Sequence, residues 1–195
     1  MCGRFYIEMD EPIDDLIDLI NRAEDKLRKT GSSLPRGEIR PGDCAAVIAM
    51  NRSLQRSVFP MRWGFKMDKR LLINARSETA SQKPTFRSSM QERRCLVPAS
   101  AYFEWDHRTK PLVKYKFEQP GCPLMYMAGL YRFEPESPQP VFTILTREAA
   151  PEIACFHDRM PVILPSSLTD AWLDRHHAPQ TILSQAVTHV HWQSV

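Results

Sequence analysis

Hydrophobic residues occur along most of this chain in short runs that often alternate with polar residues and are separated by prolines and glycines. Runs of this length, rich in Val, Ile, Phe, Tyr and Trp, are typical of β-strands. The 16 prolines add rigid turns between them. The pattern therefore predicts strands over residues 44–50, 56–65, 70–76, 94–105, 112–119, 124–131, 141–146, 160–164 and 188–192.

Helical spacing of apolar residues is confined to three segments. Residues 12–29 repeat apolar positions every three or four residues, with Pro12 in the first turn and Gly31 ending the helix. Residues 78–92 suggest a short helix interrupted at Pro84, and residues 167–176 suggest another. Residues 31–42 read as a loop. Strands outnumber helices without regular alternation, so we expect one α+β domain over residues 1–195. Its core would be a mostly antiparallel, curved sheet with helices at the periphery.

Composition narrows the class of protein. The 195 residues are 43% hydrophobic and 25% charged, which is typical of a globular domain with a core. No apolar run approaches the ~18 residues that span a membrane, and no secretory signal is visible. The five cysteines are odd in number and form no Cys-x-x-Cys pair, which favours a reducing compartment. Without heptads, a cytoplasmic monomer is the expectation.

Charge is unevenly distributed along the chain. The net charge is +3, yet residues 52–94 carry 11 basic and 3 acidic residues. A segment this basic would attract a phosphate backbone. A solvated basic face without a partner is the alternative, and composition alone does not decide between them.

Several familiar sites are missing from the sequence. There is no Gly-x-Ser-x-Gly elbow, no phosphate-binding Gly-rich loop and no His-Glu-x-x-His. His189 and His191 would share one face of a predicted strand, but two histidines without a third ligand are weak support for a metal. We therefore expect no metal and no cofactor.

Polar residues within apolar runs mark four candidate segments. Each also has a structural interpretation, such as a buried amide, an ion-paired carboxylate or core aromatic rings. Glu104 lies between aromatic residues, where burial would raise its pKa toward that of a useful acid or base. The other candidates are Asn74 with Arg76, His157 with Arg159, and Trp63 with Phe65.

Cys2 follows the initiator methionine directly. Removal of Met1 would leave a terminal cysteine whose α-amine and thiol lie on adjacent carbons. Both nucleophiles can then close on a single aldehyde carbon. A terminal amine titrates near ~8, so an appreciable fraction is neutral at neutral pH.

Together these segments resemble the SOS-response-associated peptidase (SRAP) family, whose members protect abasic sites in single-stranded DNA. The matching elements follow the family's order over most of the chain: Met1–Phe5, Arg40–Gly42, Trp63–Phe65, Asn74–Thr79, Arg94–Pro98, Phe103–Trp105, Thr146, His157 and Arg159–Pro161. The resemblance implies a thiazolidine crosslink between the exposed Cys2 and the ring-opened abasic sugar. It also implies weak strand-cleaving lyase activity, self-processing, and association with the nucleoid during DNA damage.

The same resemblance implies roles for individual residues. Cys2 would be the nucleophile, Asn74 would hold the terminal amine or the sugar, and Glu104 and His157 would move protons. The DNA contacts would come from Arg4, Pro41, Trp63, Phe65, Arg76, Trp105, Thr146 and Arg159.

Two other functions fit part of the pattern. A cysteine peptidase could use Cys2 and His157 with Glu104 or Asn74 as the third member, and it should cleave added peptides. A non-covalent single-stranded DNA-binding module would bind intact and abasic strands equally, with strong salt dependence.

Overall fold

A computed structural model describes the chain except for residues 1, 9, 12 and 29–32. The expectations for Met1, for Pro12 in the first helix and for Gly31 at its end lie outside the described residues. The expected α+β class is confirmed. The sheets are mostly antiparallel, and parallel pairing occurs only where β12 (Val141–Glu148) meets β4 (Arg56–Trp63) and β7 (Asn74–Arg76), as far as the described residues show.

Five strands of the larger sheet close on themselves. β12, β4, β3 (Cys44–Met50), β8 (Arg94–Ala99) and β11 (Met125–Arg132) pair in that order, and β11 pairs with β12 again. β13 (Arg159–Pro161) and β7 extend this sheet beside β12, and β14 (Ile163–Leu164) extends it beside β11. Closed pairing buries every second side chain inside. β8 is buried along its whole length because α3 (Pro84–Glu92) and α4 (Thr169–Leu173) also pack against it.

The second sheet carries the N-terminal strand. Its order is β15 (His191–Ser194), β10 (Val113–Glu118), β9 (Ala101–Asp106), β1 (Arg4–Ile7) and β2 (Gly37–Ile39). β8 and β9 follow each other directly but belong to different sheets. At the corner between them, the amide and the hydroxyl of Ser100 both donate to the carbonyl oxygen of Tyr6, each at 2.9 Å. This corner attaches β1 to the larger sheet.

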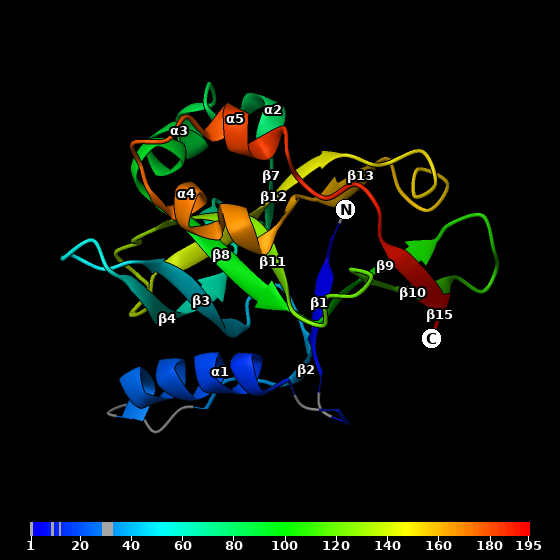
Figure 1. Cartoon of the computed structure of the whole chain (residues 1–195), viewed down its shortest axis with the longest axis horizontal. Helices are drawn as coiled ribbons and strands as arrows, with labels where there is room; N and C mark the ends of the chain where they lie inside the picture. The colour runs from blue at the N-terminus through cyan, green and yellow to red at the C-terminus, as the bar shows by residue number, and fades with distance from the viewer. Residues whose placement is uncertain (1, 9, 12, 29–32) are drawn as a thin grey trace.

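Helices cover two opposite sides of the larger sheet (Figure 1). α1 (Asp14–Leu27) packs Leu16, Ile20, Ala23 and Leu27 against β3 and β4. On the other side lie α2 (Ser77–Ala80), α3 (Pro84–Glu92), α4 (Thr169–Leu173), preceded by a 3-10 turn at Ser166–Leu168, and α5 (Pro179–Leu183). None of the described helices is long and apolar enough to cross a membrane.

Several predicted boundaries were wrong. The run 94–105 is two strands, and 70–76 divides into β6 (Arg70–Leu72) and β7. Pro84 begins α3 rather than interrupting a helix, because its missing N–H is tolerated in the first turn. The predicted loop 31–42 contains β2, and His189 lies ahead of β15, so it does not share that strand with His191.

Gly64 explains why the run 56–65 ends early. Its φ of +118° turns the chain from β4 into β5 (Phe65–Met67), which pairs with β6 as a separate hairpin. A Cβ at this position would lie 3.0 Å from Cβ of Leu71, so a larger residue would be strained by both conformation and contact.

Candidate active site and nucleic-acid interface

The Cys2 side chain is fully buried just ahead of β1. Its Sγ donates a weak hydrogen bond to the carbonyl oxygen of Arg4 at 3.7 Å. Burial raises the pKa of the thiol far above its usual range, and the negative charge of Glu104 raises this pKa further. The thiol is therefore protonated at neutral pH and needs a base before it can act as a nucleophile.

Asn74 is the residue that contacts Cys2 from the larger sheet. Its Nδ2 donates a hydrogen bond of 2.9 Å to the carbonyl oxygen of Cys2. Asn74 begins β7, which runs parallel to β12 with Asn74 opposite Ile144. The bond therefore fixes the N-terminal segment relative to β7, which is itself paired with β12 of the larger sheet.

Glu104 supplies a carboxyl group on the central strand of the second sheet. Its side chain is 3% exposed, and burial raises its pKa to about 7, with the Asp158 carboxylate acting in the same direction. A carboxyl with this pKa exchanges its proton readily at neutral pH. Its charge acts on the pKa of the Cys2 thiol, so the two groups lie within electrostatic reach of each other.

His157 lies in the segment that joins β12 to β13. The backbone N–H of Arg159 donates to its Nδ1 at 2.9 Å, which leaves the ring proton on Nε2. Burial lowers the pKa of His157, so the neutral ring is the main form at pH 7. The Asp158 carboxylate, 2.7 Å from Nδ1, pairs with the ring only when the ring is protonated.

Four of the expected DNA contacts are at least partly exposed. Arg4 lies 5.8 Å from the centre of the Trp105 ring and pairs with Glu38 at 2.5 Å. Pro41 is exposed in the turn between β2 and β3. Arg76 is exposed at the end of β7, and within the part of the chain that the structure describes it has no ion-pair partner. These side chains are accessible to a polyanion.

Trp63 and Phe65 do not fit the expectation that they stack on bases. Both are fully buried. The Trp63 indole stacks on Phe142 at 6.2 Å between ring centres, and its Nε1 donates to the Ile73 carbonyl at 2.9 Å. Gly64 turns the chain between them, so the pattern that suggested a base platform belongs to the core.

Thr146 and Arg159 also differ from their expected role. Thr146 is fully buried in β12. Arg159 forms a bidentate pair with Glu78, 2.8 Å for each bond, and donates to the Thr146 carbonyl at 2.7 Å. This guanidinium lowers the pKa of Glu78 to about 2. A guanidinium neutralised in this way is a poor phosphate ligand, and Arg159 instead fixes α2 beside the strand that follows His157.

The β5–β6 hairpin carries functional candidates that the sequence analysis missed. Met67 and Leu71 are 41% and 44% exposed, and Lys69 and Arg70 lie between them in sequence. Leu71 also lies next to Gly42, which follows Pro41. In the sequence, these candidates could have been found from the basic and apolar residues that lie close together in the basic segment 52–94.

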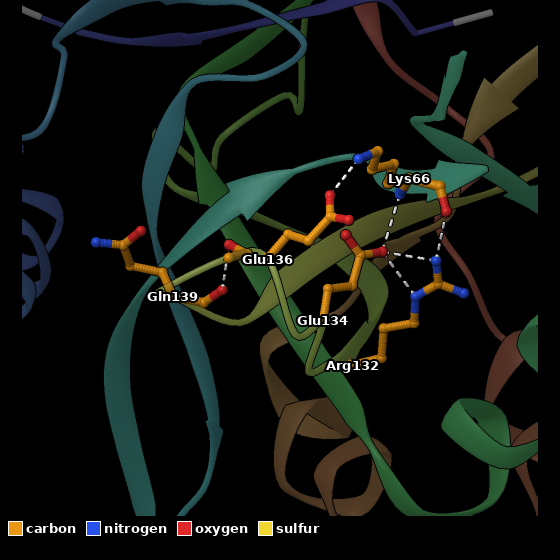
Figure 2. Close-up of polar contacts among 6 residues, drawn as sticks. Lys66, Arg132, Glu134, Glu136 and Gln139 are labelled. Carbon is orange, nitrogen blue, oxygen red and sulfur yellow. Dashed lines mark hydrogen bonds and ion pairs between the residues drawn. The ribbon is translucent and has the colours of Figure 1, made fainter. Parts of the chain in front are cut away.

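A polar network holds the base of this hairpin (Figure 2). Oε1 of Glu134 accepts hydrogen bonds from the backbone N–H of Lys66 at 2.9 Å and from two nitrogens of Arg132. Arg132 donates in turn to the Lys66 carbonyl at 2.8 Å, and its guanidinium lies 4.4 Å from the centre of the Phe65 ring. The Lys66 ammonium pairs with Glu136. The end of β11 therefore fixes where β5 leaves the core.

Comparison with known families identifies the family to which this chain is related. The model of the family described as SOS response associated peptidase (SRAP) matches residues 1–195. The chain belongs to this family. The resemblance inferred from the ordered motifs is thereby confirmed, while the roles of the individual residues remain predictions.

Curated SRAP relatives extend over most of the chain. The abasic site processing protein YoqW of Bacillus subtilis is 32% identical over 187 residues, covering 89% of this chain and 80% of its own. The abasic site processing protein YedK of Escherichia coli is 28% identical over 180 residues, with coverage of 89% and 79%. A crystal structure of a protein from Bacteroides thetaiotaomicron superposes with a TM-score of 0.78 at 19% identity, covering 100% of this chain and 92% of that one, which shows the shared fold.

Over residues 2–8, 10–11, 13–28 and 33–195, no group of three or more His, Cys, Asp or Glu side chains is arranged to hold a metal ion. All five cysteines are free thiols.

Proposed function

We propose that this protein binds abasic sites in single-stranded DNA and forms a covalent thiazolidine crosslink through Cys2 after removal of Met1. The observation that carries the proposal is the placement of the Cys2 thiol within electrostatic reach of Glu104, whose pKa is about 7, with Asn74 bonded to the Cys2 carbonyl. Relatives over most of the chain are named abasic site processing proteins, which supports the same substrate.

The reaction needs two bond-forming steps at one carbon. The α-amine of Cys2 attacks the ring-opened aldehyde of the abasic sugar, and loss of water gives an imine. Glu104 takes the thiol proton, sulfur bonds to the imine carbon, and the nitrogen accepts the C=N electron pair and a proton. The product is a five-membered ring that contains both nitrogen and sulfur. Its stability comes from this second bond, because an imine alone hydrolyses.

Glu104 and His157 divide the proton transfers in this scheme. A carboxyl with a pKa of about 7 is present in both forms at neutral pH, so it can protonate the departing oxygen and accept the thiol proton. The neutral His157 ring carries its proton on Nε2 and would donate it to a sugar oxygen. The same imine acidifies the adjacent C–H, so slow strand cleavage by elimination is a side reaction of this site.

The strand would be held by the exposed groups around Cys2. Arg76 would bind a phosphate, and Arg4 would bind another beside its pair with Glu38. Trp105, Pro41 and the exposed apolar side chains of the β5–β6 hairpin would contact bases. Bases must be unstacked to make such contacts, which favours single-stranded substrate.

The geometry favours this function over a cysteine peptidase. A peptidase cysteine is activated by a hydrogen bond to a neighbouring imidazole base. The hydrogen bond from the Cys2 sulfur goes instead to the Arg4 carbonyl oxygen.

A denaturing gel tests the proposal. Protein whose N-terminus is confirmed by intact mass is mixed with an abasic single-stranded oligonucleotide and with the undamaged strand. We expect a shifted band that survives heat and SDS on the abasic strand alone, absent in Cys2→Ala. Cys155→Ala, which removes an exposed thiol, is the matched control and should crosslink normally. An adduct that persists in Cys2→Ala would overturn the mechanism.

A further inference from the structure

Tyr102 places a hydroxyl group inside the molecule at an unexpected position. It lies on β9 opposite Phe5 of β1 and Phe117 of β10, and its side chain is fully buried. Its ring stacks on Phe117, with 4.9 Å between ring centres and 14° between planes. Among the described residues, no group forms a hydrogen bond with the Tyr102 hydroxyl. Phenylalanine would fill this space without burying an unpaired polar group, which costs stability.

The surroundings of this hydroxyl contain the reacting group. Side chains two residues apart on a strand point to the same side, so Tyr102 shares a face of β9 with Glu104. The Cys2 thiol and the Glu104 carboxyl both act electrostatically on the Tyr102 hydroxyl, and burial with these two groups raises the pKa of Tyr102 well above its usual value. The hydroxyl therefore keeps its proton throughout the physiological range and can act as a donor.

Few other charged groups face Tyr102. Asp106 continues the same face of β9, but its carboxylate is bound to Arg108. Lys114 and Lys116 of β10 lie on the opposite face of the strand from Phe117. The Lys114 ammonium lies over the Phe103 ring and the Lys116 ammonium over the Tyr6 ring. The His157 segment approaches through Asp158, which acts on Glu104. Tyr115 of β10 lies opposite Glu104 on the shared face. Among the described residues, the ionisable groups that act electrostatically on the Tyr102 hydroxyl are Cys2 and Glu104.

We propose that Tyr102 is a further residue of the crosslinking reaction, donating a hydrogen bond from its hydroxyl to the Cys2 sulfur as that sulfur loses its proton. The proposal rests on the proposed role of Cys2 as nucleophile. A neutral thiol is a weak acceptor and a thiolate is a strong one, so the bond forms mainly in the reactive state. Stabilisation that appears only in that state accelerates the reaction.

The proton balance assigns separate tasks to Tyr102 and Glu104. Glu104 receives the thiol proton, sulfur forms its bond to the imine carbon, and the imine nitrogen takes the released electron pair and a proton. Tyr102 keeps its own proton at every stage. In the closed ring the sulfur is a thioether, which is again a weak hydrogen-bond acceptor. The hydrogen bond is therefore strong only at the thiolate stage and weak both before and after it. Tyr102 should therefore speed ring closure and ring reopening together.

The test compares Tyr102→Phe with the wild-type protein on two aldehydes. Formaldehyde closes the same ring with a terminal cysteine and needs no DNA contacts, and intact mass reports the gain of one aldehyde less one water. The abasic oligonucleotide reports the complete reaction. Tyr131→Phe is the matched control, because Tyr131 is half-buried on β11 of the larger sheet, where its ring lies 6.0 Å from the centre of the Phe133 ring. Thermal unfolding checks that each variant folds.

We expect Tyr102→Phe to slow ring closure about tenfold with both aldehydes, the effect of losing one hydrogen bond to a charged group. We also expect its rate to rise at higher pH than that of the wild type, because the thiolate has lost its donor. Unchanged rates and pH profiles would overturn the role of Tyr102. Closure on formaldehyde without any crosslink to abasic DNA would instead overturn the proposed function and leave the Tyr102 comparison intact. Failure of the wild type on both aldehydes would overturn both.

Discussion

Asn74 donates a hydrogen bond of 2.9 Å to the carbonyl oxygen of Cys2, joining two residues that are 72 positions apart. The bond fixes the peptide unit next to the α-amine that would attack the aldehyde. Asn74→Asp keeps the shape but replaces the N–H donor with a carboxylate oxygen facing a carbonyl. We expect this variant to crosslink at least tenfold more slowly, since one such bond contributes ~1 kcal/mol and the repulsion adds to its loss.

The rate of gel-shift formation on an abasic strand measures this effect. Asn51→Asp is the matched control, because the Asn51 side chain accepts bonds from two amides in the turn between β3 and β4. It should crosslink at the wild-type rate. Equal rates for Asn74→Asp and the wild type would show that the bond does not position the N-terminus for reaction.

Glu104 makes stability depend on pH. Its pKa is raised from 4.5 to about 7. The folded state therefore binds the proton more tightly than the unfolded state, and the associated stability is present below pH 4.5 and lost as pH rises to 7. Glu104→Gln removes the charge that burial penalises. Relative to the wild type, we expect the free energy of unfolding of the variant to increase by up to about 3 kcal/mol between pH 4.5 and 7. Above pH 7 the difference should stay constant.

Urea unfolding at several pH values measures this difference. The same substitution should slow crosslinking about a hundredfold, because a general acid or base of this kind contributes at least that much. Glu148→Gln, an exposed carboxylate near the end of β12, is the control for both measurements. A wild-type stability that does not fall between pH 4.5 and 7 relative to Glu104→Gln would exclude the raised pKa.

Much of the fold could be predicted because the ends of the apolar runs in the sequence coincide with the ends of the strands in the structure. Residues 44–50 form β3 with the predicted bounds, and 112–119 and 124–131 are correct to within one residue at each end. The division of 94–105 could not be predicted from local pattern. It depends on Ser100, whose amide and hydroxyl bond to Tyr6, a residue 94 positions away.

Site residues that belong to the ordered motifs and lie near Cys2 could be predicted from the sequence. The roles of residues that the fold buries or pairs could not. The motifs indicated Asn74 and Glu104. The structure shows Asn74 bonded to the Cys2 carbonyl oxygen and Glu104 acting electrostatically on the Cys2 thiol. Trp63 and Phe65 had the composition of a base platform, but nothing in the sequence shows which aromatic rings the closed sheet encloses. Arg159 likewise reads as a phosphate ligand until the fold places Glu78 against it.

The pair between Glu78 and Arg159 supports the His157 segment from outside the site. Arg159 lowers the pKa of Glu78 to about 2, so the associated stability is present above the usual pKa of 4.5 and lost as pH falls toward 2. We expect Glu78→Gln to reduce the free energy of unfolding at pH 7 by about 1 kcal/mol, a small value because Glu78 is half exposed. The difference from the wild type should disappear by pH 2 in urea titrations.

Glu92→Gln provides the comparison for that measurement. Glu92 pairs with Arg93 at 3.9 Å on the surface, so its loss should leave stability unchanged within error. A Glu78→Gln variant as stable as Glu92→Gln at pH 7 would mean that the bidentate pair contributes nothing.

Arg76 is the exposed guanidinium nearest to Asn74 in sequence. If it binds a phosphate beside the lesion, Arg76→Gln should weaken non-covalent binding of single-stranded DNA and make it less sensitive to salt. On a single strand each phosphate contact contributes ~0.7 to the slope of log K against log salt, so we expect the slope to fall by about that amount. Fluorescence anisotropy on an unreactive strand at several salt concentrations gives this slope.

The control for Arg76 is Arg52→Gln. Arg52 is exposed in the turn between β3 and β4, which Figure 1 shows at the end of the molecule opposite to β9 and β10. Its removal lowers the net charge equally but should leave the slope unchanged. If the slope fell equally in both variants, the effect would come from net charge rather than from a phosphate contact of Arg76.

Glu134 determines whether the β5–β6 hairpin is held in place. Its carboxylate accepts from the Lys66 amide and from Arg132, whereas Glu136 pairs with the exposed Lys66 ammonium only (Figure 2). Glu134→Ala leaves the Lys66 amide and the Arg132 guanidinium without this acceptor. We expect it to lose ~1–2 kcal/mol of stability and to speed exchange of the Lys66 amide hydrogen. Glu136→Ala removes a pair between solvent-exposed groups and should change neither quantity.

The consequence for function follows from the position of Met67 and Leu71 on this hairpin. If their apolar side chains contact unstacked bases, an unfixed hairpin must be ordered on binding, which weakens affinity for single-stranded DNA. Glu134→Ala should then bind an undamaged strand several-fold more weakly than Glu136→Ala, at a temperature where both are fully folded. Met67→Ala should weaken binding without altering Lys66 exchange, because it removes the contact and leaves the network intact. Equal affinity in all three variants would place the strand elsewhere on the molecule.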